Sequence, residues 1–267
     1  MSGVKPKKAL GQHFLTDLGV ADRIASTLDA YRGLDVLEIG PGMGVLTQFL
    51  LDKHPADKVT LAEIDTESVD WLKTHLPEPR PRIVEGDFLQ MDLDDLFPGT
   101  ADFCVIGNYP YNISSQIFFR VLDYRRRIVC CSGMLQREVA ERLAAAPGTK
   151  ARGILSVLLQ AWYDVEYLFT VSEKVFNPPP KVKSGVVRLT RNGRESLGVD
   201  ESLFKTVVKT TFGQRRKTIR NSVRSLLPPG ADAVAVPYAA MRPEQLSVEQ
   251  FVELSAAVEA ARKNAAV

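Results

Sequence analysis

Short apolar runs alternate with amphipathic segments over the first two-thirds of the chain. Runs rich in Val, Ile and Leu predict buried strands, each ended by a polar or glycine turn. These strands are expected at residues 35–39, 59–64, 82–85, 103–107 and 127–134, with late strands at 163–169 and 186–190. Helical spacing of apolar residues predicts helices at 18–30, 45–53, 66–75, 114–121, 137–146 and 154–162. Alternating strands and helices predict an α/β fold with a mostly parallel sheet.

The pattern changes after Thr190. Residues 191–198 are polar and contain two glycines, which is typical of a linker. Helical spacing resumes at 201–227 and again from Pro243 to the end. We therefore expect two domains, an α/β domain over residues 1–192 and a small helical domain over residues 199–267.

Composition narrows the class of protein only slightly. The 267 residues are 45% hydrophobic and 25% charged, with a net charge of +2, as in ordinary globular proteins. The three cysteines, Cys104, Cys130 and Cys131, lie in apolar stretches without metal-ligand spacing, so no metal site is expected. Neither an apolar run of membrane-spanning length nor a secretory signal is evident, and we expect a cytoplasmic protein without a membrane anchor.

Polar groups follow four consecutive predicted strands. Gly40 and Gly42 belong to a glycine-rich turn after the first strand, and Glu63, Asp87 and Asn108 end the next three. The carboxyl ends of parallel strands meet at one edge of a sheet, so these groups predict a ligand crevice there. The nicotinamide fingerprint needs a third glycine where Val45 stands, so that cofactor is disfavoured.

The tetrad Asn108-Tyr109-Pro110-Tyr111 directly follows the fourth strand. The Asn108 side-chain oxygen and the Pro110 carbonyl can both accept hydrogen bonds from one NH₂ group, and the Tyr111 ring can stack on a flat heterocycle. This combination suits the exocyclic amine of a nucleobase. A plain turn between strand and helix is the alternative, because Asn and Pro are common turn residues.

The segment from Phe204 to Leu227 carries seven basic residues and no acid. If it is one helix, Arg216, Arg220 and Arg224 form a single basic stripe, and Ile219, Val223 and Leu226 form an apolar one. Solvated helix faces usually mix charges of both signs, whereas a surface of one sign favours contact with nucleic-acid phosphates.

Several motifs together resemble those of the ribosomal RNA adenine N6,N6-dimethyltransferases that act on small-subunit (16S) RNA, and the resemblance covers nearly the whole chain. The motifs are residues 8–15, the glycine turn with its preceding strand at 36–42, the stretch 108–114 that contains the tetrad, and the stretches 135–139, 176–182 and 212–219. Two positions depart from the family pattern, with His13 in place of the usual Asn and Tyr109 in place of the usual Leu. We expect Tyr109 to change packing only, and we hypothesise that the His13 contact is sensitive to pH.

The resemblance implies a Rossmann-like methyltransferase that uses S-adenosylmethionine to dimethylate N6 of two adjacent adenosines in a hairpin loop near the 3′ end of 16S rRNA. It implies that the protein is a monomer that acts on the small ribosomal subunit or its precursor, without a metal, and contributes to subunit biogenesis. The implied cofactor-binding residues are His13, Leu15, Gly40, Gly42, Glu63, Asp87 and Asn108. The implied catalytic residues are Asn108, Pro110, Tyr111 and Phe176, and the implied RNA-binding residues are Arg215, Arg216, Lys217, Arg220 and Arg224. A methylase of large-subunit RNA or DNA, and a non-catalytic ribosome-assembly factor, remain alternatives.

Overall fold

The computed structural model describes residues 4–231, 233 and 235–265 and divides the chain into two compact units. The first unit comprises Met1–Glu141 and Asp164–Arg191, and the second comprises Arg142–Tyr163 and Asn192–Val267. We predicted from the sequence that residues 142–163 belong to the first domain, but the structure groups them with the C-terminal helices. The reason is packing, because helix α7 (Ile154–Gln160) contacts α8 (Glu201–Gly213) and α10 (Val248–Asn264).

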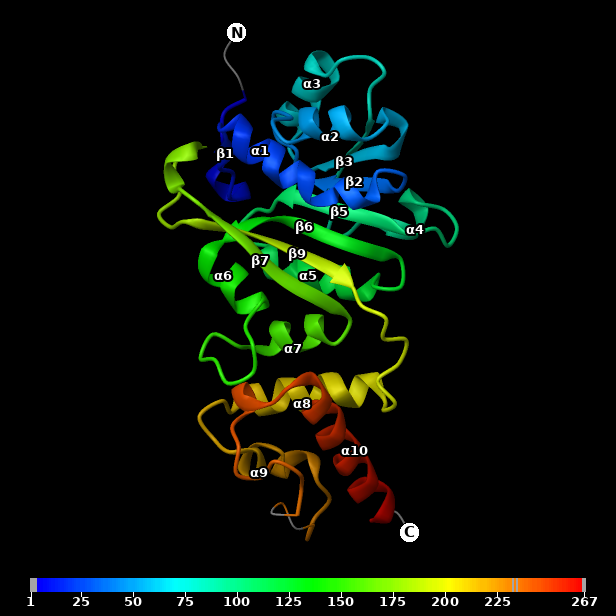
Figure 1. The fold of residues 1–267 in the computed structure, drawn as a ribbon, viewed down its shortest axis with the longest axis vertical. Coiled ribbons are helices and arrows are strands. Elements are labelled where there is room, and N and C mark those ends of the chain that lie inside the picture. The colour runs from blue at the N-terminus through cyan, green and yellow to red at the C-terminus, as the bar shows by residue number, and fades with distance from the viewer. Residues whose placement is uncertain (1–3, 232, 234, 266–267) are drawn as a thin grey trace. The chain divides into compact units, whose positions relative to one another are not determined.

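A seven-stranded sheet forms the centre of the first unit, with the order β4-β3-β2-β5-β6-β9-β7 (Figure 1). Strands β2 to β6 pair in parallel, and β9 runs antiparallel to β6. Strands β3 and β4 follow one another on one side of β2, and β5 and β6 follow on its other side. The direction in which strands are added therefore reverses between β2 and β5. The strands are β2 (Asp35–Ile39), β3 (Val59–Glu63), β4 (Arg82–Glu85), β5 (Phe103–Asn108), β6 (Ile128–Gln136), β7 (Tyr163–Val171) and β9 (Ser184–Arg191).

Alternation along the strands explains how the sheet is covered. Val36, Cys104 and Met134 join one buried apolar cluster with Ile24 of α1 and Leu50 of α2. Neighbouring strand residues point to the opposite face, because side chains alternate along a strand. The helices of this unit are α1 (Leu18–Ala25), α2 (Thr47–Lys53), α3 (Thr66–His75), α4 (Leu93–Leu96), α5 (Ser114–Asp123) and α6 (Arg137–Leu143). The predicted α/β architecture with a mostly parallel sheet is confirmed.

The second unit is helical and packs around α8 and α10. The Asp200 side chain caps α8 by accepting a hydrogen bond from the Leu203 N–H, and Ser247 caps α10 in the same way from Gln250. Phe212 and Phe251 stack with their ring centroids 6.0 Å apart, which joins the two helices through their apolar faces. The helix predicted from Pro243 begins as a single turn, η6 (Pro243–Gln245), before α10. Residues 266–267 lie outside the described residues.

The continuous helix predicted over residues 201–227 is wrong. Helix α8 ends at Gly213, residues 214–217 form a turn, and a short α9 (Ile219–Ser222) and a 3-10 turn (Arg224–Leu226) follow. Glycine is a poor helix former, and three consecutive cations in one turn repel one another. The N–H groups of Ile219 and Arg220 donate to the carbonyls of Met241 and Ala239, at 2.8 and 3.0 Å, instead of extending α8. Arg216, Arg220 and Arg224 therefore do not form a stripe on one helix.

Candidate active site

A cavity lies at the carboxyl ends of β2, β3, β4 and β5, where the strand order reverses. Its walls are the glycine turn after β2, the ends of β3 and β4, the tetrad after β5, and an N-terminal segment, residues 9–14. Among the residues predicted from sequence, it brings together His13, Gly40, Gly42, Glu63, Asp87, Asn108, Pro110 and Tyr111. Crevices of this kind are the usual ligand sites of open α/β sheets.

The glycine turn requires glycine for two reasons. Gly40 and Gly42 have φ values of +66° and +56°, in the left-handed region that favours glycine. A Cβ atom on Gly42 would also lie 2.9 Å from a ring carbon of Phe14. The bare backbone therefore leaves room for the N-terminal segment and for a ligand close to the main chain.

Glu63 is the acid at the end of β3, and its position is fixed by backbone donors. Its carboxylate accepts hydrogen bonds from the N–H groups of Gly42 (3.0 Å), Ile64 (2.9 Å) and Asp65 (2.9 Å). The residue is 4% exposed, and burial raises the pKa of its carboxyl although these donors oppose the rise. The arrangement presents a preorganised acceptor at the cavity wall, of the kind that binds ribose hydroxyls.

Glu38 lies in β2, just before the glycine turn, and does not line the cavity. It is 1% exposed, and burial raises the pKa of its carboxyl to about 8, although the Thr47 hydroxyl donates to it at 2.7 Å. The nearby Glu63 carboxyl raises this pKa further. Glu38 therefore holds its proton at neutral pH, and it contributes a hydrogen-bonding group rather than a charge.

Asn108 and Tyr111 are oriented by hydrogen bonds at the ends of their side chains. The Asn108 amide nitrogen donates to the His13 carbonyl at 3.0 Å, which leaves its oxygen as an acceptor. The Tyr111 hydroxyl lies 2.5 Å from the Ser184 hydroxyl, and burial raises the pKa of Tyr111. The Pro110 carbonyl accepts from the Ile113 N–H at 3.2 Å and keeps a second lone pair. Ser114, the first residue of α5, donates to the Tyr111 carbonyl at 3.3 Å.

Leu15 and Phe176 are predicted site residues whose side chains the structure does not bring to the cavity. They pair across a two-stranded sheet, β1 (Phe14–Leu15) and β8 (Phe176–Asn177), which the sequence analysis missed. Both side chains enter the apolar core and are 5% and 4% exposed. The Phe176 side chain therefore lies in the core beside the cavity wall, and its role over a base stacked on Tyr111 stays a prediction.

His13 connects the N-terminal segment to the Pro178–Pro180 stretch. Its Nδ1 lies 2.8 Å from the Pro178 carbonyl, and its ring centroid lies 5.5 Å from that of Tyr111. A carbonyl only accepts hydrogen bonds, so Nδ1 carries a proton in this contact. The pH sensitivity of the His13 contact stays a prediction.

Tyr109 fills space that two glycines leave open. Its ring is buried, and its hydroxyl donates to the Ser132 carbonyl at 2.7 Å. A Cβ atom on Gly133 would lie 2.7 Å from this ring, and one on Gly107 would lie 3.0 Å from it. The Tyr109 N–H also donates to the Met134 carbonyl at 2.9 Å, so the tetrad is anchored to β6 by main chain and side chain.

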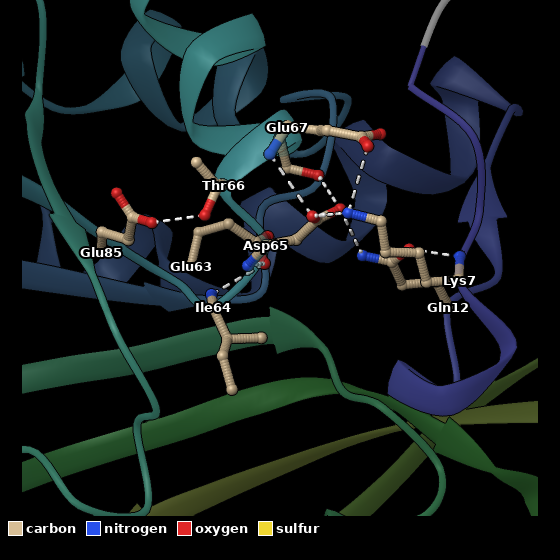
Figure 2. A network of polar contacts seen from close by, with 9 residues as sticks. Lys7, Gln12, Glu63, Ile64, Asp65, Thr66, Glu67 and Glu85 are labelled. Carbon is tan, nitrogen blue, oxygen red and sulfur yellow. Dashed lines mark hydrogen bonds and ion pairs between the residues drawn. The ribbon is translucent and has the colours of Figure 1, made fainter.

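A polar network joins the N-terminal segment to the turn after β3 (Figure 2). The Lys7 ammonium pairs with Asp65 and lies 3.4 Å from Glu67, and Gln12 donates to Asp65 at 3.2 Å. Burial alone would raise the pKa of Asp65, but the hydrogen bonds from Lys7, Gln12 and Ser68 hold it below its ordinary value. This network was not predicted from the sequence, because Lys7 and Asp65 are 58 residues apart and neither position has a local sequence signal.

The basic residues of the second unit differ in their exposure and in their hydrogen-bond partners. Arg220 and Arg224 are exposed and line one cavity beside Pro228 and Pro229. Arg216 and Lys217 are exposed in the turn after α8, whereas Arg215 is half-buried and donates to the Lys150 carbonyl. Within the described residues, Arg216, Lys217, Arg220 and Arg224 have no ion-pair partner, which leaves four cations available to an anionic ligand.

Two classes of site are not found within the described part of the chain. No helix there has the length and apolar character needed to cross a bilayer. Nor do three or more His, Cys, Asp or Glu side chains gather there as a metal-binding group. The three cysteines are buried, and burial raises the pKa of the Cys130 and Cys131 thiols to about 12.

The fold and this cavity define a class, the Rossmann-like methyltransferases. The structure resembles that of the 23S rRNA methyltransferase ErmE, with a TM-score of 0.66 and 27% identity over 92% of this chain and 99% of that one. It also shares its fold with a dimethyladenosine transferase from Plasmodium falciparum, with a TM-score of 0.79 and 23% identity over 94% and 98% of the two chains.

The particular family follows from the sequence comparisons. The profile described as "Ribosomal RNA adenine dimethylase" matches residues 3–259, and the chain belongs to this family. It is 68% identical over 252 residues to a Parabacteroides distasonis protein named "Ribosomal RNA small subunit methyltransferase A", covering 94% of this chain and 93% of the relative. A Porphyromonas gingivalis protein of the same name is 63% identical over 255 residues, covering 96% and 98%. The predicted family and enzyme class, an adenine dimethyltransferase that acts on ribosomal RNA, are confirmed.

Proposed function

We propose that this protein dimethylates N6 of two adjacent adenosines in a hairpin loop near the 3′ end of 16S rRNA, within the small ribosomal subunit or its precursor. Relatives with 63–68% identity carry the small-subunit name, which supports this substrate over large-subunit RNA. The main support for methylation of an amine is that the Asn108 side-chain oxygen remains available as an acceptor beside Pro110. Both residues line the same cavity as the glycine turn and Glu63. We further propose that the protein acts as a cytoplasmic monomer.

The cavity fits a nucleoside-type methyl donor. Glu63 supplies a fixed acceptor for ribose hydroxyls, and the bare backbone at Gly40 and Gly42 permits close approach. Asp87 accepts from the Leu89 N–H at 2.9 Å through one oxygen, and its other oxygen can accept from the donor's adenine amine. S-adenosylmethionine, when bound, supplies an electrophilic methyl group on sulfur. His13 lines the cavity with the rest of the N-terminal segment, whereas Leu15 supports this segment from the apolar core.

The tetrad then activates the acceptor. The lone pair of adenine N6 is delocalised into the ring, so the amine is a weak nucleophile. Hydrogen bonds from both N6 hydrogens to the Asn108 oxygen and the Pro110 carbonyl favour a pyramidal nitrogen whose lone pair is free to attack. The new N–C bond forms as the C–S bond breaks, and the nitrogen then releases one proton to solvent. Tyr111, held by Ser184, stacks on the base, and catalysis comes mainly from positioning and electrostatics.

The second unit supplies RNA contacts in this proposal. Arg216, Lys217, Arg220 and Arg224 are exposed cations without ion-pair partners in the described part of the chain, and they suit a phosphate-tracking role. Arg215 is already engaged with the Lys150 carbonyl, so we assign it a structural role beside that surface.

Labelled methyl transfer tests the function. The protein is incubated with labelled S-adenosylmethionine and, in separate reactions, with unmodified small subunits, large subunits or DNA, and labelled nucleotides are mapped after nuclease digestion. We expect N6,N6-dimethyladenosine at two adjacent positions of the small-subunit RNA. Label confined to large subunits or to DNA would assign the protein to one of those substrates instead, and no label at all would favour an assembly factor.

A further inference from the structure

A second cavity adjoins the first on the far side of the His13 and Tyr111 rings. It is lined by Lys8, Gln136, the Pro178–Pro180 stretch and Lys181, and it shares Gly11, Gln12, His13 and Tyr111 with the first cavity. Asn108, Pro110 and the glycine turn line only the first cavity. The two acceptors proposed for the reacting amine, on Asn108 and Pro110, therefore do not line the second cavity. A ligand of the second cavity is not the reacting base.

The charges of this second cavity favour an anionic ligand. Lys8 and Lys181 are exposed, neither has an ion-pair partner among the residues described, and no acid is among the side chains that line the cavity. Two unpaired cations at one opening can neutralise backbone phosphates.

The uncharged walls favour a base. The Tyr111 and His13 rings and the three prolines provide flat or apolar surfaces, and Val182 beside them is 46% exposed, which is unusual for a large aliphatic side chain. Gln136 makes no side-chain hydrogen bond within the described structure, so its amide can both donate to and accept from a base edge. Aromatic stacking, a free amide and adjacent cations together are the usual means of holding an unpaired nucleotide.

We propose that the second cavity binds the nucleotide next to the target adenosine in the RNA strand, with its base against Tyr111, His13 and Gln136 and its phosphates at Lys8 and Lys181. This inference rests on the proposed function. The Tyr111 ring lines both cavities, so a strand that crosses it places one base in each. Because the strand has one direction on the protein, the second cavity takes the neighbour on one side of the target, and for two adjacent adenosines this neighbour is the other adenosine in one of the two reactions.

A coupling experiment between protein and RNA tests this site. Wild-type protein and Gln136→Ala are assayed on unmodified small subunits whose target loop carries either the natural neighbour or an abasic neighbour. We expect the abasic neighbour to raise KM by about tenfold, because a stacked base is lost, and Gln136→Ala to raise KM by a few-fold, because one hydrogen bond is lost, with kcat nearly unchanged in both cases. The two changes together should raise KM no further than the larger single effect, because both remove the same contact.

The lysines are tested through salt dependence. Lys8→Ala/Lys181→Ala should lower the slope of log KM against log salt by about 1.4, or about 0.7 for each phosphate contact to a single strand. Lys73→Ala is the matched control, because Lys73 is an exposed, unpaired lysine on α3 that lines neither cavity.

The outcomes separate this inference from the proposed function. Additive effects of Gln136→Ala and the abasic neighbour, or an unchanged salt slope, would overturn the inference while the enzyme still methylates. A fall in kcat at constant KM for Gln136→Ala would place the reacting base in the second cavity and would also overturn it. Failure of the wild-type protein to label any small subunit would instead reject the proposed function.

Discussion

Tyr109 shows how one residue can depart from a family pattern without entering the chemistry. Its hydroxyl satisfies the Ser132 carbonyl, and its ring fills the space over Gly107 and Gly133. The ring and its hydroxyl are therefore part of the core, and a smaller side chain at this position would leave the space over the two glycines empty.

We therefore expect Tyr109→Leu to be more destabilising than Tyr109→Phe. Loss of the hydroxyl alone should lower the free energy of unfolding by about 1–2 kcal/mol, because a buried carbonyl loses its donor. Loss of the ring should cost about 2–4 kcal/mol, because a cavity opens beside two glycines that cannot fill it. Urea unfolding measures both values. A Tyr109→Leu variant as stable as wild type would show that the ring does not support the core.

Glu38 makes stability depend on pH in a direction opposite to that of most acids. Its pKa is raised from 4.5 to about 8 in the folded protein, so the folded state keeps a proton that the unfolded state releases. Stability from this group is therefore present at low pH and falls as pH rises through this window, by up to about 1.4 kcal/mol per unit. Glu38→Gln should remove this fall. Between pH 5 and pH 8, the urea midpoint of the variant should rise progressively relative to that of the wild type. Urea midpoints that change in parallel with pH would contradict the raised pKa of Glu38.

At the scale of elements, the N-terminal segment is attached in part by polar contacts. Lys7 and Gln12 both bind Asp65, which directly follows Ile64 at the cavity wall (Figure 2). Lys7→Ala should loosen residues 9–14 over the cavity and weaken the binding of S-adenosylmethionine by up to about fivefold. Lys5→Ala is the control, because Lys5 is a nearby exposed lysine without a partner in the described structure. Titration calorimetry that gives equal affinities for the two variants would show that this network does not hold the segment for binding.

The basic segment of the second unit is divided into a turn, a short helix and a 3-10 turn, and we expect its cations to act unequally. Arg220→Ala/Arg224→Ala should weaken RNA binding and reduce its salt slope by about 1.5, because both residues line one cavity. Arg215→Ala should change the slope less, because this residue is committed to the Lys150 carbonyl. Filter binding at several salt concentrations measures the slopes. Equal slopes for wild type and the double variant would assign these arginines to ordinary solvated surface.

The elements that sequence predicted best are those with a strong local signal. Strands β2 and β4 and helix α3 begin and end where the hydrophobic pattern placed them, because a buried run bounded by turn residues has few alternatives. The break after Gly213 and the pairing of β1 with β8 were missed. Both depend on partners far along the chain, on Met241 and Ala239 in one case and on Phe176 in the other.

At the scale of the whole molecule, the candidate site was predictable because it is built from the ends of successive strands. Glu63, Asp87 and Asn108 follow three strands that the pattern identified, and parallel pairing brings them to one edge. The burial of Phe176 and the second cavity were not predictable, because they depend on how the Pro178–Pro180 stretch packs against the N-terminal segment.

The most direct measurement of the central claim is the rate of methyl transfer by Asn108→Ala on unmodified small subunits, with the variant's affinity for S-adenosylmethionine determined in parallel. We expect kcat to fall by about a hundredfold or more, because one of two acceptors that activate the amine is lost. Cofactor affinity should fall by only a few-fold, because Glu63 and Asp87 remain. Near-normal turnover of the variant would contradict the claim that this amide grips the adenine N6.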